Sequence, residues 1–195
     1  MTTLEAQATP APVLEVGDVL LQSMSCYACS LIEAEEDSAY SHMGIVLSTL
    51  PEVMIAEAWG PTHLVALREF VKKSKTGSRL RVLRFRNPEV NRFLTVHQVE
   101  WRRIFAADFN GNAYDDQFLW NNFDERGREK FYCSELVTKL IATQIDLELP
   151  VKRMHFTKNR DAWARYFHGV IPDGKFGNSP GDFERSELFH DAGEI

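Results

Sequence analysis

The sequence predicts an α+β protein in which an antiparallel sheet packs against helices. Short apolar runs bounded by turn residues recur between residues 17 and 85, which is typical of β-strands. Helical periodicity takes over from Pro88 and returns after Cys133. No linker divides the chain of 195 residues, so we expect a single domain over 14–195 behind a flexible lead-in over 1–13.

The first elements follow from local composition. Residues 17–22, "GDVLLQ", form an apolar run after a Gly-Asp turn and predict a strand. Residues 29–40, "CSLIEAEEDSAY", have the composition of a helix. Two β-type runs follow, 43–49 and 52–59, and the two residues between them, one of which is proline, indicate a hairpin.

The middle of the chain is predicted to continue with a helix, a strand and a longer helix. Residues 67–73 have the pattern of a short helix, and residues 76–85 alternate between polar and apolar side chains as a strand does. From 88 to 107 apolar residues recur at helical spacing, and the proline that begins this range suits a first helical turn.

The last third contains one well-marked helix. A polar stretch over 108–130 leads to Cys133, and an apolar stripe begins directly after it. The stripe consists of Leu136, Val137, Leu140 and Ile141. Residues 169–195 are rich in turn residues with scattered aromatics, so we expect this tail to wrap the surface.

Charge and hydropathy exclude several classes of protein. The net charge is 22 − 28 = −6, so nucleic acid is not an expected partner. No apolar run approaches the roughly 20 residues that span a bilayer. The N-terminal residues show no secretory signal, and three cysteines are too few for a disulfide framework, so a cytoplasmic location is expected.

Cys133 has two readings. A cysteine at a helix N-terminus is favoured as thiolate, the form that acts as a nucleophile. Cys133 also precedes Leu136 and Val137 by three and four residues, which places it on the core stripe, and buried free cysteine is common. The helix alone favours a packing role, so a nearby base is needed to prefer the nucleophile.

His42 and Glu57 supply a base and a partner for it. His42 stands immediately before a predicted strand in "YSHMGIVL", where a rigidly placed base can face a cleft. Glu57 lies inside the neighbouring apolar run, where a carboxylate needs a polar partner. If the two strands pair, Glu57 can hold the imidazole as the third member of a triad does. The alternatives are a turn histidine and an exposed edge-strand glutamate.

These segments carry a family resemblance. In order, "GDVLLQ", "YSHMGIVL", "IAEAWGP", "YDDQF" and "FYCSELV" resemble the YiiX/YebB-like permuted members of the NlpC superfamily of cysteine hydrolases, and "SPGDFERSELF" is similar to their closing segment. The resemblance implies a circularly permuted papain-like fold in which histidine precedes cysteine. It also implies Cys133 as nucleophile, His42 as base and Glu57 as the residue that orients the base.

Two tyrosines are further candidates for the site. Tyr40 lies two residues before His42, and Tyr114 opens the "YDDQF" segment. Either can line the cleft and bind substrate, or donate a hydrogen bond to an oxyanion. The alternative for both is a core tyrosine whose hydroxyl is satisfied within the protein.

The "SCYACS" segment suggests a rival chemistry. Its CxxC spacing fits a redox pair or half of a zinc site. A Cys₃His zinc site requires that Cys26, Cys29, Cys133 and His42 converge. A second CxxC or an HxxxH motif is missing, and two small residues at a helix start are the simpler interpretation.

The sequence therefore predicts a cysteine hydrolase that cleaves an amide bond through an acyl-thioester on Cys133, with no metal or organic cofactor. The substrate class implied by the resemblance is a peptide, a cell-wall fragment or an acylated lysine. One alternative is an acyltransferase that passes the acyl group to an amine or a lipid. Another is a non-catalytic, zinc-stabilised binding module.

Overall fold

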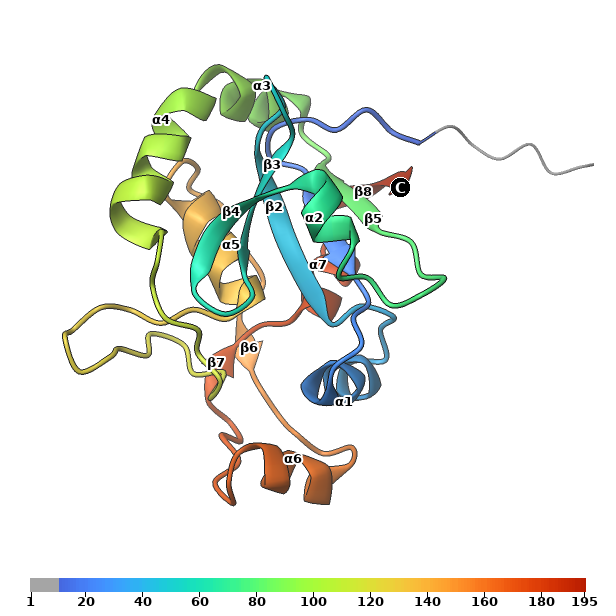
Figure 1. Cartoon of the computed structure of the whole chain (residues 1–195), viewed down its shortest axis with the longest axis vertical. Coiled ribbons are helices and arrows are strands. Elements are labelled where there is room, and N and C mark those ends of the chain that lie inside the picture. Colours follow the sequence, from blue (N-terminus) through green and yellow to red (C-terminus); the bar gives the residue numbers. More distant parts are fainter. Residues whose placement is uncertain (1–10) are drawn as a thin grey trace, which may run out of the picture.

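The computed structural model describes residues 11–195, so most of the lead-in expected over 1–13 lies outside the described residues. A six-stranded sheet forms the centre of the protein, in the order β4-β3-β2-β1-β5-β8, and all its neighbours pair antiparallel (Figure 1). The predicted α+β class is therefore confirmed. The strands are β1 Val19–Gln22, β2 His42–Ser48, β3 Met54–Ala58, β4 Thr62–Ala66, β5 Arg81–Phe85 and β8 Phe189–Glu194, with a separate ribbon of β6 Lys152–Arg153 and β7 Phe176–Gly177.

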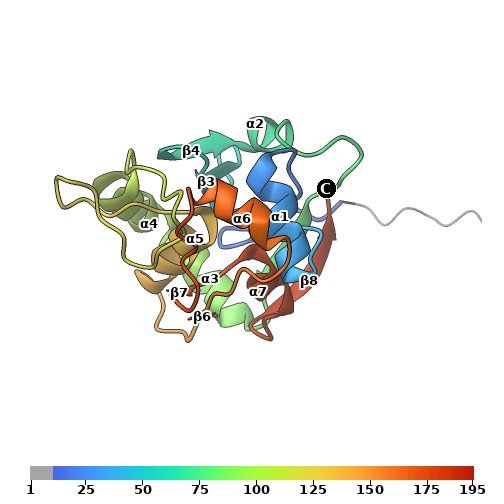
Figure 2. The ribbon, with the colours of Figure 1, turned by 90° about the horizontal axis from the view of Figure 1, so that it is seen from below.

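Helices pack against both faces of this sheet. They are α1 Tyr27–Glu36, α2 Leu67–Val71, α3 Pro88–Val96, α4 Gln98–Ile104, the π-helical turn η1 Phe105–Phe109, α5 Cys133–Ala142, α6 Arg160–Tyr166 and α7 Pro180–Arg185. Figure 2 shows α1 and α6 side by side, and the two helices are in contact. No helix within residues 11–195 combines the length and the apolar character that a membrane span requires.

Alternation along the strands gives the sheet two apolar faces. One face contributes Val19, Leu21, Ile45 and Leu47, and it packs against α3, α4 and α5. The other contributes Leu20, Val46, Ile55 and Val82, and Phe70 of α2 covers it. Successive side chains of a strand point to opposite faces, so nearly continuous apolar runs predict a sheet that is buried on both sides.

The predicted hairpin over 43–59 is confirmed, and the structure extends it. In β2 and β3, Gly44 pairs with Glu57 and Ile45 with Ala56. The strand β4 was not predicted from the sequence, and it pairs along the whole of β3. The strand is only five residues long and runs directly into α2, so its period-2 signal is short.

Three predicted elements differ from the observed ones. The helix expected over 29–40 ends at Glu36, because Asp37 adopts the left-handed conformation of a helix C-terminus. The helix expected over 88–107 is interrupted at His97, which separates α3 from α4. The tail expected to wrap the surface instead contributes β8 to the main sheet, and its Phe183 and Phe189 are buried.

Candidate active site

Cys133 is the first residue of α5, as the sequence predicted. Tyr132 before it is extended, with φ −95° and ψ 169°, and no side chain caps the helix. The first N–H groups of a helix have no carbonyl partner within it, so those at the start of α5 remain donors beside the Cys133 sulfur. The apolar stripe of α5 packs against β2 and β3 and fixes this end of the helix.

His42 is the first residue of β2 and is almost fully buried. Its Nε2 lies 2.8 Å from Oε2 of Glu57. Phe70 and Trp59 flank the ring, with centroids 5.7 Å and 5.6 Å away. The position opposite Glu57 is Gly44, where a Cβ would lie 3.0 Å from the Phe70 ring and 2.5 Å from an Ile55 methyl group. Glycine at this position therefore lets Phe70 approach the strand beneath His42.

The electrostatics of His42 link it to Cys133. Burial lowers the pKa of the imidazole, but the interactions of the ring with Cys133 and with Glu57 outweigh this effect and raise the pKa of His42 from 6.5 to about 9. Nε2 is engaged by Glu57, which leaves the other ring nitrogen for Cys133. At neutral pH the ring is therefore an imidazolium, and its positive charge lies beside the sulfur of Cys133.

Glu57 has two further partners, His63 and Lys73, that the sequence did not reveal. Oε1 of Glu57 lies 3.1 Å from Nε2 of His63 and also accepts a hydrogen bond from Nζ of Lys73. Burial raises the pKa of the Glu57 carboxyl, but the contacts with His42 and Lys73 bring it below its ordinary value. His63 stands directly opposite Glu57 in the β3–β4 register, so recognition of β4 would have revealed it.

The two candidate tyrosines lie in different places. Tyr114 lies near Cys133, because the chain around it pairs with Phe131 just before α5. Burial and the nearby charge of Cys133 raise the pKa of Tyr114 well above 10, so the phenol keeps its proton and can donate it in a hydrogen bond. Tyr40 is buried in the core and interacts with Arg81 instead, and it lines neither cavity beside Cys133.

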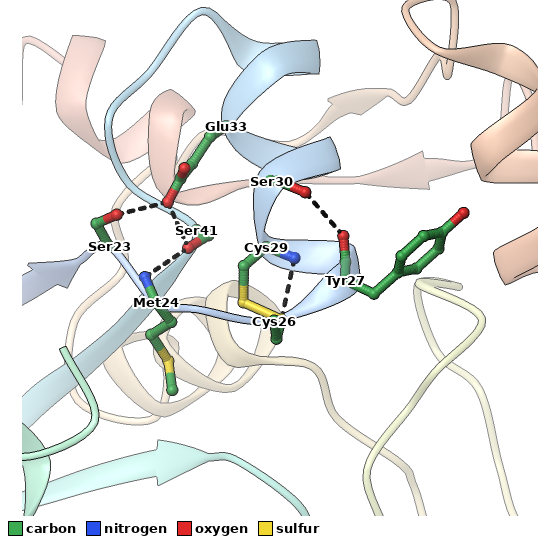
Figure 3. The surroundings of a disulfide bond; sticks show 8 residues. All are labelled: Ser23, Met24, Cys26, Tyr27, Cys29, Ser30, Glu33 and Ser41. Carbon is green, nitrogen blue, oxygen red and sulfur yellow. Dashed lines mark hydrogen bonds between the residues drawn. A yellow bond between two sulfur atoms is a disulfide. The ribbon is translucent and has the colours of Figure 1, made fainter. Parts of the chain in front are cut away.

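Cys26 and Cys29 form a disulfide at the start of α1 (Figure 3). Cys26 caps this helix, and its sulfur accepts a hydrogen bond from the Cys29 N–H at 3.0 Å. The CxxC spacing at a helix start brings the two Cα atoms to 5.0 Å, within the range for a disulfide. The two residues stand at a helix start, as the simpler interpretation expected, and the structure adds the bond between them.

A hydrogen-bonded strap joins this helix to the strand that carries His42. The hydroxyls of Ser23 and Ser41 donate to the same Glu33 oxygen at 2.7 Å and 2.9 Å (Figure 3). Ser41 directly precedes His42 and also accepts from the Met24 N–H. The start of α1, with its disulfide, is thus held beside the base.

Two cavities meet at Cys133, and Tyr114 and Ile32 line both of them. The larger, here called the His42 cavity, has a volume of about 330 Å³ and is also lined by His42, Trp59 and the disulfide. The smaller, here called the apolar cavity, has a volume of about 40 Å³. Its wall includes Phe118, Tyr132, Met154, Phe156 and Trp163.

Residues 13–177 match the family model of the permuted papain-like amidase enzymes, the YaeF/YiiX or C92 family. The chain belongs to this family. The match covers the whole region from the first strand to β7, including Cys133, His42 and Glu57. The resemblance found in the sequence is thereby confirmed, and with it the permuted papain-like fold.

Two individual proteins are similar to this chain, one in sequence and one in structure. The uncharacterized protein YiiX of Escherichia coli K12 is 24% identical over 135 residues, which span 69% of this chain and 61% of that protein. A crystal structure described as metalloprotein YiiX from Escherichia coli O157:H7 aligns with a TM-score of 0.77 at 18% identity, covering 93% of this chain and 97% of that one. At this identity, the structural likeness shows the fold alone.

The environment of the three cysteines predicts which one reacts. Without reductant, iodoacetamide should modify the folded protein once, at Cys133, because the other two sulfurs are bonded to each other. Peptide mapping after alkylation across a pH series is the measurement. Labelling of Cys26 or Cys29 with Cys133 protected would contradict the assignment.

Proposed function

We propose that this permuted papain-like amidase is a cysteine hydrolase that cleaves an amide bond, with Cys133 as nucleophile, His42 as base and Glu57 as the residue that orients it. The observation that carries the proposal is the line of contacts from the carboxylate of Glu57 through the buried His42 ring to the Cys133 sulfur at the start of α5. A catalytic triad is defined by these contacts in space, from nucleophile to base to orienting group. The order of the three residues along the sequence does not matter.

The chemistry follows from these contacts. The thiolate of Cys133 attacks the amide carbonyl carbon, and the carbonyl oxygen takes up the negative charge. His42 gives its proton to the leaving nitrogen, the C–N bond breaks, and an acyl-thioester remains on Cys133. Water then attacks the thioester as His42 takes one of its protons, which releases the acid and restores the thiolate–imidazolium pair.

Donors for the oxyanion are available at the same place. The N–H groups at the start of α5 have no intrahelical partner, and preorganised donors of this kind stabilise the charge of a tetrahedral intermediate. Tyr114 keeps its proton and lies near the sulfur, so it is a candidate second donor.

The residues do not fit a structural zinc site, although one relative is described as a metalloprotein. Cys26 and Cys29 are bonded to each other, and both oxygens of Glu57 are engaged by His42, His63 and Lys73. Within residues 11–195 no group of three or more His, Cys, Asp or Glu side chains is arranged to hold a metal ion.

Because the residues do not fit a zinc site, we expect the protein to be free of zinc. The purified protein should contain far less than one zinc per chain, and a chelator should leave its melting temperature unchanged, because no side-chain cluster in the described part of the chain, 11–195, links metal binding to folding. Elemental analysis and thermal unfolding with and without EDTA are the measurements. Stoichiometric zinc together with a chelator-sensitive melting temperature would favour the zinc-stabilised binding module.

Trapping of the acyl group tests the proposed function. Intact-mass analysis after incubation with a panel of acyl amides and peptides should reveal an adduct on Cys133 that the Cys133→Ala variant lacks. Release of free acid, with no transfer to an added amine or lipid, distinguishes hydrolysis from acyl transfer. Absence of an adduct or a product across the panel would contradict the proposal.

A further inference from the structure

The two cavities beside Cys133 differ in their access to the proton of His42. Both have Cys133 in their walls, but His42 lines only the larger one. In the proposed reaction the leaving nitrogen takes its proton from His42 and must lie within hydrogen-bonding reach of the ring. The leaving amine therefore belongs in the His42 cavity, whose volume of about 330 Å³ admits a large group.

The other substituent of the carbonyl then has a defined position. The carbonyl carbon bonds to the Cys133 sulfur, so the acyl group and the amine extend from it in different directions. The amine occupies the His42 cavity, and the apolar cavity is the second space that Cys133 lines. We propose that the apolar cavity is the acyl-binding subsite of this enzyme and that it selects short apolar acyl groups, from acetyl to butyryl. This inference rests on the proposed function.

The small space between the walls of the cavity favours a short chain. One water-sized group needs roughly 10–15 Å³ of such space, so about 40 Å³ accommodates about three. A butyryl group places three carbons beyond its carbonyl. The walls are a close-packed cluster in which Phe118, Tyr132, Met154 and Trp163 are all buried, and such a cluster does not expand without repacking.

The character of the wall sets the chemistry. Two carboxylates, Glu35 and Glu36, reach the cavity, but each already has its partners. Glu35 accepts hydrogen bonds from the Thr157 and Lys158 backbone and from the Trp163 indole, and Glu36 pairs with Lys152 and Arg185. They therefore leave no unpaired negative charge for a cationic group, and the aromatic and methionine side chains favour an alkyl group.

A series of esters that differ only in acyl length tests this assignment. The 4-nitrophenyl esters from acetate to octanoate share one leaving group, and the rate of Cys133 acylation is measured by release of 4-nitrophenol and by intact mass. Each rate is divided by that of a free thiol with the same ester, and the Cys133→Ala background is subtracted. Propionyl and butyryl should react at least about tenfold faster than octanoyl, because one misfitting methylene in an apolar pocket costs about 10-fold or more.

A variant with an enlarged pocket locates the selection. Met154→Ala removes part of the cavity wall and should raise the octanoyl rate relative to propionyl by at least about tenfold. Met24→Ala is the matched control, because Met24 is equally buried and lines neither cavity. If Met154→Ala does not fold, Met154→Val makes a smaller change at the same position, directly after β6.

The possible outcomes distinguish failure of the acyl subsite from failure of the proposed hydrolase function. Equal rates for propionyl and octanoyl in the wild type, or an equal shift in Met24→Ala, would overturn the acyl subsite while acylation of Cys133 still supports the hydrolase. No acylation of Cys133 at any chain length would overturn the proposed function, and the subsite with it.

Discussion

A folded His42→Ala variant should lose acyl-thioester formation at neutral pH by at least about 10⁴-fold. The variant has neither the base that takes the proton of Cys133 nor the acid that protonates the leaving amine. Raising the pH should restore part of the acylation, because hydroxide then generates the thiolate. The measurement is turnover of an activated acyl ester from about pH 6 to 10, with circular dichroism to establish folding.

Two controls accompany this experiment. His155→Ala removes an exposed histidine that lines neither cavity and should leave the activity unchanged. Cys133→Ala should stay inactive at every pH, because alkali cannot replace the missing sulfur. Full activity in folded Cys133→Ala would end the cysteine mechanism, and full activity in folded His42→Ala would remove His42 from it.

The pH dependence of the wild type follows from the pKa of His42. The pKa is raised to about 9 in the folded protein, so the protonated ring should hold the thiolate–imidazolium pair across neutral pH. Because folding raises the pKa of His42, protonation of the ring stabilises the folded protein. This contribution to stability is fully present below about pH 6.5 and is lost as pH rises through about 9. Activity toward an amide substrate should decline over the same alkaline range, as the ring loses the proton that the leaving amine requires.

Glu57→Gln should reduce activity by up to the order of 10⁴-fold and leave the protein folded. Glutamine can fill the same space, but it removes the negative charge that holds the proton on His42. Activity of the variant should therefore decline at a lower pH than activity of the wild type, where the pKa of His42 is about 9. The measurement is the pH–rate profile of the variant and of Glu52→Gln, an exposed position on the same hairpin.

The stability of Glu57→Gln provides a second test of the role of Glu57. Folding lowers the pKa of Glu57, so its stabilising contribution is present above the unfolded value of about 4.5 and is lost as pH falls through the folded value. The melting temperature of Glu57→Gln should thus lie below that of the wild type at neutral pH, and the two should converge in acid. Wild-type activity with an unshifted alkaline decline in the folded variant would remove Glu57 from the triad.

The sequence by itself determined the elements whose signals are local. The β2–β3 hairpin follows from two apolar runs around a turn, and the start of α5 at Cys133 follows from the apolar stripe behind it. The contact between His42 and Glu57 follows as well, since a histidine at a strand start and a glutamate in the next strand lie close together once the hairpin forms. A period of two or of 3.6 residues is set by the backbone alone and can be recognised without knowledge of the fold.

Only the tertiary structure decided which distant residues meet. The pairing of β4 with β3 brings His63 to Glu57, and the turn after α2 brings Lys73 to the same oxygen. The tail becomes β8 because β5 offers it an open edge and the core accepts Phe183 and Phe189. The apolar cavity likewise combines side chains from α1, α5, α6 and the segments between them. These contacts depend on packing between elements far apart in the sequence, which local periodicity does not encode.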